Sequence, residues 1–178
     1  MRVLVTAATR HEATSEIAAA IAEGLVRRDV DAELRPIGEV GEVGAYDAVV
    51  LGSAVYVGRW LQEARQFAER HAAALATMPV WLFSSGPLGP AGARVPLSEP
   101  ADAATLAQLT RAREHRVFAG RLDMSSLGLP ARLVGAREGD ERDWAAIDAF
   151  AAEIAAALKE EDSPPAQPVD PSRLRATT

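Results

Sequence analysis

Residues 2–21, which read RVLVTAATRHEATSEIAAAI, decide the fold. The first five residues are a β-rich run without helical period, and a polar stretch at residues 9–12 follows them. Apolar side chains then recur at the spacing of a helix, at Ile17, Ile21 and Leu25. We therefore predict a strand, a loop and a helix within residues 1–28, with Thr14 as the helix N-cap and Glu16 in the first turn.

The same alternation of strand and helix continues along the chain. We predict further strands at residues 31–36, 47–53, 80–85 and 115–120. We predict further helices at residues 61–75, 101–114 and 144–158, the last one capped by Asp143. Parallel strands need helical crossovers, so this order predicts an α/β fold: a doubly wound, five-stranded parallel sheet with helices on both faces. Residues 1–160 form this domain, and we expect residues 161–178 to be a disordered, Pro-rich tail.

Composition excludes several classes of function. The chain has 178 residues, 48% of them apolar, which is enough for one core, and it has no cysteine for disulfides, thiolate chemistry or cysteine-bound metal. A net charge of −6 argues against nucleic acid, and the three histidines show no metal-ligand spacing. Because no run of 18 apolar residues and no signal peptide is present, we expect a cytoplasmic protein without an integral membrane segment.

Three loops are expected to form the ligand site. In a doubly wound sheet, ligands bind beyond the carboxyl ends of the strands, which points to residues 9–14, 53–58 and 84–89. The first loop leads into a helix N-terminus, which favours an anion such as phosphate, and the second carries Tyr56. No dinucleotide or triphosphate glycine motif follows the first strand, so a mononucleotide is favoured. Taken alone, Thr9 and Thr14 also fit turn and cap roles, and Tyr56 also fits packing.

These loops carry a resemblance to a known family. Residues 5–18 (VTAATRHEATSEIA), 51–60 (LGSAVYVGRW) and 83–89 (FSSGPLG) resemble the FMN loops of flavodoxin-domain proteins. The branch is similar to the menaquinone-dependent protoporphyrinogen oxidases, and the likeness extends through residues 114–123 and 139–144. This resemblance implies a flavodoxin-like fold with strand order 2-1-3-4-5 and non-covalently bound FMN.

The resemblance also implies which residues hold the cofactor. The phosphate loop comprises Thr9, Arg10, His11, Glu12, Ala13 and Thr14. One side of the flavin ring meets Ser53, Ala54, Val55, Tyr56, Val57 and Gly58. The other side meets Ser84, Ser85, Gly86, Pro87, Leu88 and Gly89. No side chain is expected to act as a catalytic acid or base, and no metal site is expected.

Three functions are compatible with this site. The first is an FMN-dependent oxidoreductase or electron carrier whose partner is a redox protein or a quinone. Its most specific form is a protoporphyrinogen oxidase. The second is a flavodoxin-like domain that has lost FMN and acts as a non-redox binding or regulatory module. Glu12 and Ala13 motivate it, because family members have Gly followed by Ser or Gln there. The third replaces FMN with a deazaflavin.

Overall fold

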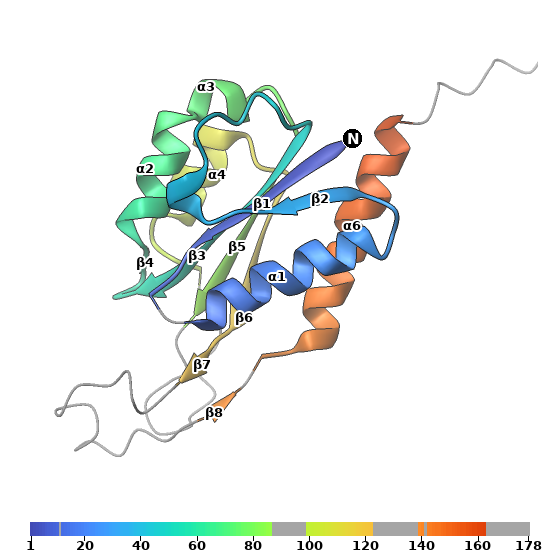
Figure 1. Cartoon of the computed structure of the whole chain (residues 1–178). Coiled ribbons are helices and arrows are strands. Elements are labelled where there is room, and N and C mark those ends of the chain that lie inside the picture. Colours follow the sequence, from blue (N-terminus) through green and yellow to red (C-terminus); the bar gives the residue numbers. More distant parts are fainter. Residues whose placement is uncertain (11, 87–98, 123–138, 141, 163–178) are drawn as a thin grey trace, which may run out of the picture.

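The computed structural model describes residues 1–10, 12–86, 99–122, 139–140 and 142–162. Five parallel strands form its central sheet in the order β2-β1-β3-β5-β6 (Figure 1). These strands are β1 (Arg2–Ala8), β2 (Asp31–Leu34), β3 (Ala48–Tyr56), β5 (Val80–Gly86) and β6 (Glu114–Ala119). The predicted fold class and the predicted order of the parallel strands are therefore confirmed.

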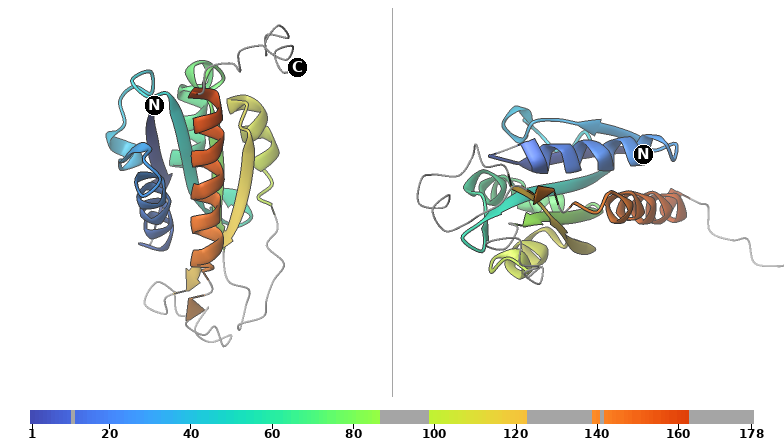
Figure 2. Two further views of the ribbon diagram at one scale, coloured as in Figure 1. Left: turned by 90° about the vertical axis from the view of Figure 1, so that its right-hand side faces the viewer. Right: turned by 90° about the horizontal axis from the view of Figure 1, so that it is seen from below.

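Helices cover both faces of this sheet, as Figure 2 shows. One face carries α1 (Glu12–Val26) and α6 (Trp144–Asp162), which pack against each other. The other face carries α2 (Gln62–Arg70), α3 (Ala72–Leu75), α4 (Ala103–Thr110) and the 3-10 turn η1 (Ile37–Glu39). Two short antiparallel additions complete the described part: β4 (Arg59–Trp60) pairs with β3, and β7 (Arg121–Leu122) pairs with β8 (Gly139–Asp140).

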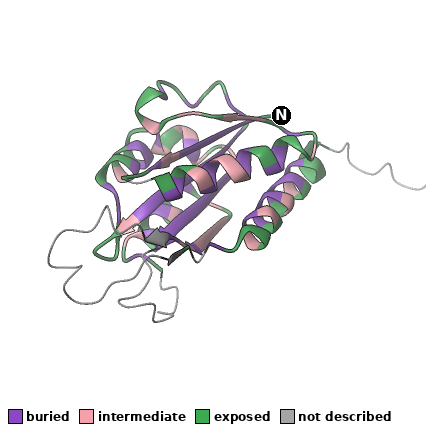
Figure 3. Cartoon of the chain, turned by 60° about the horizontal axis from the view of Figure 1, so that its bottom comes forward, coloured by how far each residue is buried: buried purple, intermediate pink, exposed green. Residues whose placement is uncertain are grey.

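The core consists of two apolar layers separated by the sheet. On β5, Trp81 and Phe83 face the layer under α1 and α6, whereas Val80 and Leu82 face the layer under α2 and α4. The central strands are buried on both sides and appear purple along their length in Figure 3. Continuous apolar runs are typical of such strands, which explains why the sequence located them.

Several predicted boundaries differ from the structure. Thr14 is not the N-cap of α1, because the helix begins two residues earlier, at Glu12. A carboxylate in the first turn interacts favourably with the helix dipole, and Thr14 is buried instead of capping. The predicted helix 61–75 is divided at His71 into α2 and α3. The Asp143 cap is confirmed, since its Oδ1 accepts a hydrogen bond from the Ala146 amide at 3.0 Å.

The C-terminal helix extends slightly further than predicted. Helix α6 runs to Asp162, so the first two residues of the predicted tail are helical. Residues 163–178 lie outside the described part of the chain. Among the helices of the described residues, none has the combined length and apolarity needed to cross a bilayer.

One glycine permits a close approach between the central strands and the aromatic core. Gly52 on β3 pairs with Phe83 on β5, and the Phe83 ring lies over the Gly52 backbone. A Cβ atom at position 52 would lie only 2.1 Å from the Phe83 Cζ atom. No side chain fits there unless the ring moves, and the ring is completely buried.

We therefore expect Gly52→Ala to lower the free energy of unfolding by about 1–3 kcal/mol, the usual effect of overpacking a core. Urea denaturation followed by circular dichroism measures the change. Gly41→Ala is the matched control, because a Cβ atom at position 41 has no neighbour within 4 Å. Equal stability of the two variants would contradict the packing described for Phe83.

Candidate functional site

The register of the sheet brings the three predicted loops to one edge. Ala8 on β1 is paired with Ser53 on β3, and Ser53 is paired with Ser84 on β5. The three strands are parallel, so their carboxyl ends lie at neighbouring positions, beside the start of α1 (Figure 1). This is the edge at which doubly wound folds bind ligands.

The first loop presents a helix start and an arginine. Thr9 and Arg10 are exposed, Glu12 is exposed at the first position of α1, and His11 lies outside the described residues. Ala13 and Thr14 are buried, so their backbone is better placed than their side chains to meet a ligand from solvent. The amide groups of the first turn lack helical acceptors and favour an anion.

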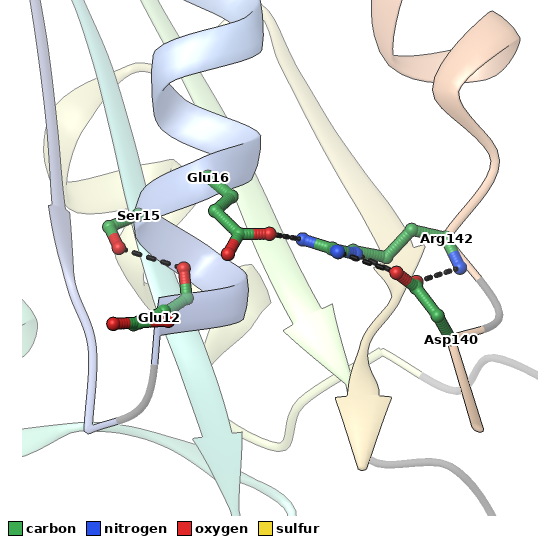
Figure 4. A network of polar contacts seen from close by, with 5 residues as sticks. All are labelled: Glu12, Ser15, Glu16, Asp140 and Arg142. Carbon is green, nitrogen blue, oxygen red and sulfur yellow. Dashed lines mark hydrogen bonds and ion pairs between the residues drawn. The ribbon is translucent and has the colours of Figure 1, made fainter. Parts of the chain in front are cut away.

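Local contacts fix this helix start. The Ser15 hydroxyl donates a hydrogen bond to the Glu12 carbonyl oxygen at 2.7 Å (Figure 4). In the same view the Glu12 side chain lies on the side of α1 away from Arg142. The Glu12 carboxylate is thus turned toward solvent, which reduces its repulsion of an anion at the helix start.

The second segment is a β-hairpin where the sequence predicted a loop. Strand β3 continues to Tyr56, turns through Val57 and Gly58, and returns as β4. Both turn residues have positive φ, 51° and 71°, as a two-residue type I′ turn requires. The prediction failed because Val has a strong preference for extended backbone and gives no signal for a turn.

The residues of this hairpin divide into a buried base and an exposed tip. Ser53 and Ala54 are buried, and Ser53 Oγ accepts a hydrogen bond from the Leu61 amide at 3.0 Å. Val55 is half-buried, whereas Val57 and Gly58 are exposed and Tyr56 is 39% exposed. Only the tip therefore offers its surface to a ligand.

Arg10 links the first two segments. Its guanidinium carbon lies 5.0 Å from the centroid of the Tyr56 ring, a cation–π contact. A positive charge and an aromatic ring thus stand together where the helix start and the hairpin tip meet. These are the groups that a phosphate and a flat ring, respectively, require.

The third segment is only partly described. Ser84, Ser85 and Gly86 belong to β5 and are buried, while Pro87, Leu88 and Gly89 lie outside the described residues. Ser84 Oγ accepts a hydrogen bond from the Trp60 indole at 2.7 Å. This bond assigns Trp60 to packing, and it engages the Ser84 hydroxyl inside the protein.

A buried arginine that the sequence analysis missed stands beside the helix start. The Arg142 side chain is only 3% exposed and makes two hydrogen bonds to the Asp140 carboxylate, at 2.8 and 2.6 Å. It also forms an ion pair with Glu16 of α1 (Figure 4). Its guanidinium carbon lies 4.4 Å from the centroid of the Trp144 ring. These hydrogen bonds raise the pKa of Arg142 above its ordinary value, against the cost of burial.

This cluster ties the start of α6 to the start of α1. Arg142 and Glu16 are separated by 126 positions, and no local pattern marks such a pair. Trp144, whose ring contacts Arg142, is 46% exposed at the first position of α6.

We expect Arg142→Met to lower the free energy of unfolding by about 2 kcal/mol, because two carboxylates lose their partner while remaining partly exposed. The double variant with Glu16→Gln should show a smaller additional loss than Glu16→Gln causes alone. Urea denaturation of the parent protein, the two single variants and the double variant gives the four free energies of unfolding of this double-mutant cycle. Strict additivity would mean that the Arg142–Glu16 pair contributes nothing in solution.

Comparisons with known proteins agree with this geometry. Residues 4–134 match the model of the flavodoxin domain. The chain belongs to the flavodoxin domain family. The match contains the helix start, the hairpin and the third loop, and no curated protein matches the sequence significantly.

Solved structures share the fold of this flavodoxin-domain protein. A flavodoxin from the domain Archaea superposes with a TM-score of 0.64 at 16% identity, covering 89% of this chain and 99% of that chain. A flavodoxin of Streptococcus pneumoniae TIGR4 superposes with a TM-score of 0.57 at 18% identity, covering 88% of this chain and 99% of that chain. Rubredoxin oxygen:oxidoreductase of Desulfovibrio gigas superposes with a TM-score of 0.61 at 12% identity. The match covers 92% of this chain but only 37% of that longer chain.

The hairpin tip of this flavodoxin-domain protein carries backbone strain. Val57 has a φ of 51°, and its side chain is fully exposed. A β-branched residue in the left-handed region costs of order 1–2 kcal/mol, which no packing recovers at a fully exposed position. Strain of this kind gathers at functional sites.

We expect Val57→Asn to raise the free energy of unfolding by about 1 kcal/mol, because Asn followed by Gly is the preferred type I′ sequence. Thermal and urea unfolding provide the measurement. Val26→Asn is the control, since Val26 is exposed but helical. A loss of stability in Val57→Asn would show that the turn differs from the one described.

Proposed function

We propose that the protein binds FMN non-covalently at the carboxyl edge of the sheet and transfers electrons through it. One observation carries this proposal: the start of α1 and the aromatic hairpin tip meet at the ligand-binding edge, joined by the Arg10–Tyr56 contact. The family membership of the chain and its fold are in agreement with a flavin site.

The described residues fit FMN in charge and in shape. The amide groups at the start of α1 and the Arg10 guanidinium suit a phosphate. The exposed Tyr56 ring and the apolar Val57 suit an isoalloxazine ring. When bound, FMN supplies electron-transfer chemistry, so the protein needs only to bind it, orient it and tune its environment.

Ser53, Ala54, Ser84 and Ser85 have a supporting role in this proposal. Their side chains are buried, so they shape the base of the site rather than its surface. Thr14, in the first turn of α1, is likewise buried. His11, Pro87, Leu88 and Gly89 lie outside the described residues, and the cofactor contacts of all the predicted site residues stay predictions.

The net charge of the chain and its resemblance to known oxidases suggest a partner for electron transfer. A net charge of −6 favours a redox partner protein with a basic surface, and a quinone is the small-molecule counterpart. The most specific version of the proposal is that the protein oxidises a protoporphyrinogen-like substrate in the cytoplasm. Its support is the similarity of residues 51–60 to the menaquinone-dependent oxidases.

One feature favours a second candidate function, a binding module without flavin. Glu12 places a negative charge at the helix start where a phosphate would lie. At about 5 Å, one unit of like charge costs about 3 kcal/mol at an effective dielectric constant of 20 and about 1 kcal/mol in water. The exposure of Glu12 selects the lower value, which a flavin site tolerates.

We expect Glu12→Gln to tighten FMN binding about fivefold, because it removes roughly 1 kcal/mol of repulsion. Quenching of FMN fluorescence during titration gives the dissociation constant. Glu23→Gln is the matched control, since Glu23 is an exposed residue at the far end of α1. It should leave the dissociation constant unchanged.

The spectrum of the purified protein separates the two candidate functions. Visible flavin absorbance that survives desalting supports the redox protein. If neither the parent protein nor Glu12→Gln retains FMN, the flavin-free module is the better description.

A further inference from the structure

A chain of four polar side chains lies inside the α2 and α4 face of the sheet. The Trp60 indole donates to Ser84 Oγ at 2.7 Å, and Ser84 Oγ lies 2.7 Å from His115 Nε2. His115 Nδ1 lies 3.4 Å from the Glu99 carboxylate. Trp60 and Ser84 are buried, and the His115 side chain is 6% exposed, whereas the Glu99 side chain is 67% exposed. The chain therefore runs from solvent to the base of the hairpin.

The chemistry of the groups fixes the direction of these hydrogen bonds. An indole N–H can only donate, so Ser84 Oγ accepts from Trp60. Among the described contacts of Ser84 Oγ, His115 Nε2 is the one atom left that can accept the single hydroxyl hydrogen, so this hydrogen is satisfied only when Nε2 carries a lone pair. The ring proton lies on Nδ1 and faces Glu99. The chain is thus complete only with a neutral His115.

The order serine, histidine, carboxylate resembles a hydrolase triad, but access excludes that function. Ser84 is 0% exposed and lies in a central strand that is paired on both sides. A nucleophile must reach its substrate from a surface or a cleft. The chain is therefore suited to holding the hairpin.

We propose that His115 is a positioning residue that holds the β3–β4 hairpin, residues 55–60, through Ser84 and Trp60, and that protonation of His115 loosens this hold. The link to FMN rests on the proposed function, because Tyr56 and Val57 form the tip of the same hairpin. A protonated ring presents N–H at Nε2, and the Ser84 hydroxyl loses its acceptor. Ser84, the hydrogen-bond partner of the Trp60 indole, then has a hydroxyl hydrogen without an acceptor.

Other contacts keep the hairpin attached when this hold loosens. The Trp60 amide donates to both Asp102 carboxylate oxygens at 3.2 Å, and the Ala101 amide donates to the Gly58 carbonyl oxygen at 2.9 Å. Protonation should therefore change the order and position of the hairpin without unfolding it.

The charges around His115 set the direction of the pH response. Glu99 and Asp102 face the ring from the segment before α4, and Arg65 of α2 lies 3.7 Å from Asp102. Glu114 and Arg116 of β6 project to the opposite face, where Arg116 pairs with Glu153 of α6 and stacks on Phe150. Burial lowers the pKa of His115 below its ordinary 6.5, and the two acidic groups oppose this only in part.

A lowered pKa in the folded protein means that the ring is neutral at pH 7. The hold is therefore complete above pH 6.5 and is lost as the pH falls through the folded pKa. Burial lowers the pKa of His71 in the same direction, so His71 needs a control of its own.

The test uses the full chain and nuclear magnetic resonance of the Trp60 indole N–H. We expect its exchange with water, corrected for intrinsic rates, to rise about tenfold between pH 7.5 and pH 5. The indoles of Trp81 and Trp144 serve as internal references. His115→Gln preserves a donor and an acceptor but cannot be protonated, so the rise should vanish. His71→Gln should keep the rise.

The outcomes separate this proposal from the proposed function. The Trp60 response does not need FMN, so its presence supports the proposal even if no flavin binds. If FMN binds, its affinity should fall about tenfold more between pH 7.5 and pH 5 in the parent protein than in His115→Gln, in which the FMN phosphate still titrates. An equal response in both proteins, or a ring proton found on Nε2 at pH 7.5, would overturn the role of His115. Ser84→Ala tests the same chain if His115→Gln fails to fold, because it should give fast indole exchange at both pH values.

Discussion

The candidate site depends on the in-register parallel pairing of β1, β3 and β5. Ala8, Ser53 and Ser84 stand side by side in one row of this sheet. A shift of one residue would exchange the faces of a strand and send Ser84 away from Trp60. The apolar layers on both faces oppose any such shift, since Phe83 and Leu82 would also exchange layers. Packing of the core thus fixes the positions of the strand ends that form the candidate site.

The sequence predicted the layers of the fold because burial leaves periodic traces. Buried runs marked β3 and β5, and the four-residue period of Ile17, Ile21 and Leu25 marked α1. The turn at Val57 left no such trace, because extended backbone is the local preference of valine. The turn is held by the pairing of β4 with β3 and by the Trp60–Ser84 bond, which joins residues 24 positions apart.

The candidate site was predicted at the level of segments, and less well at the level of side chains. The described parts of the three segments lie at one edge of the sheet, and the side chains of Ser53, Ser84 and Thr14 are buried there. Residue type cannot distinguish a serine that binds a ligand from a serine that satisfies a buried indole. Arg142 was missed for a related reason, since its partner on α1 is remote in sequence and only the folded chain brings the charges together.

The packing of α1 against α6 has a consequence for synthesis of the chain on the ribosome. The two helices approach so closely that a Cβ atom at Gly24 would lie 2.7 Å from that of Ala151. Ile147, Phe150 and Ile154 of α6 belong to the same apolar layer as Val3 and Val5 of β1, which is translated first. The nascent chain therefore emerges with the part of this face that α1 does not cover still exposed until α6 leaves the exit tunnel. During that interval the exposed aliphatic face is the surface that a ribosome-associated chaperone would recognise.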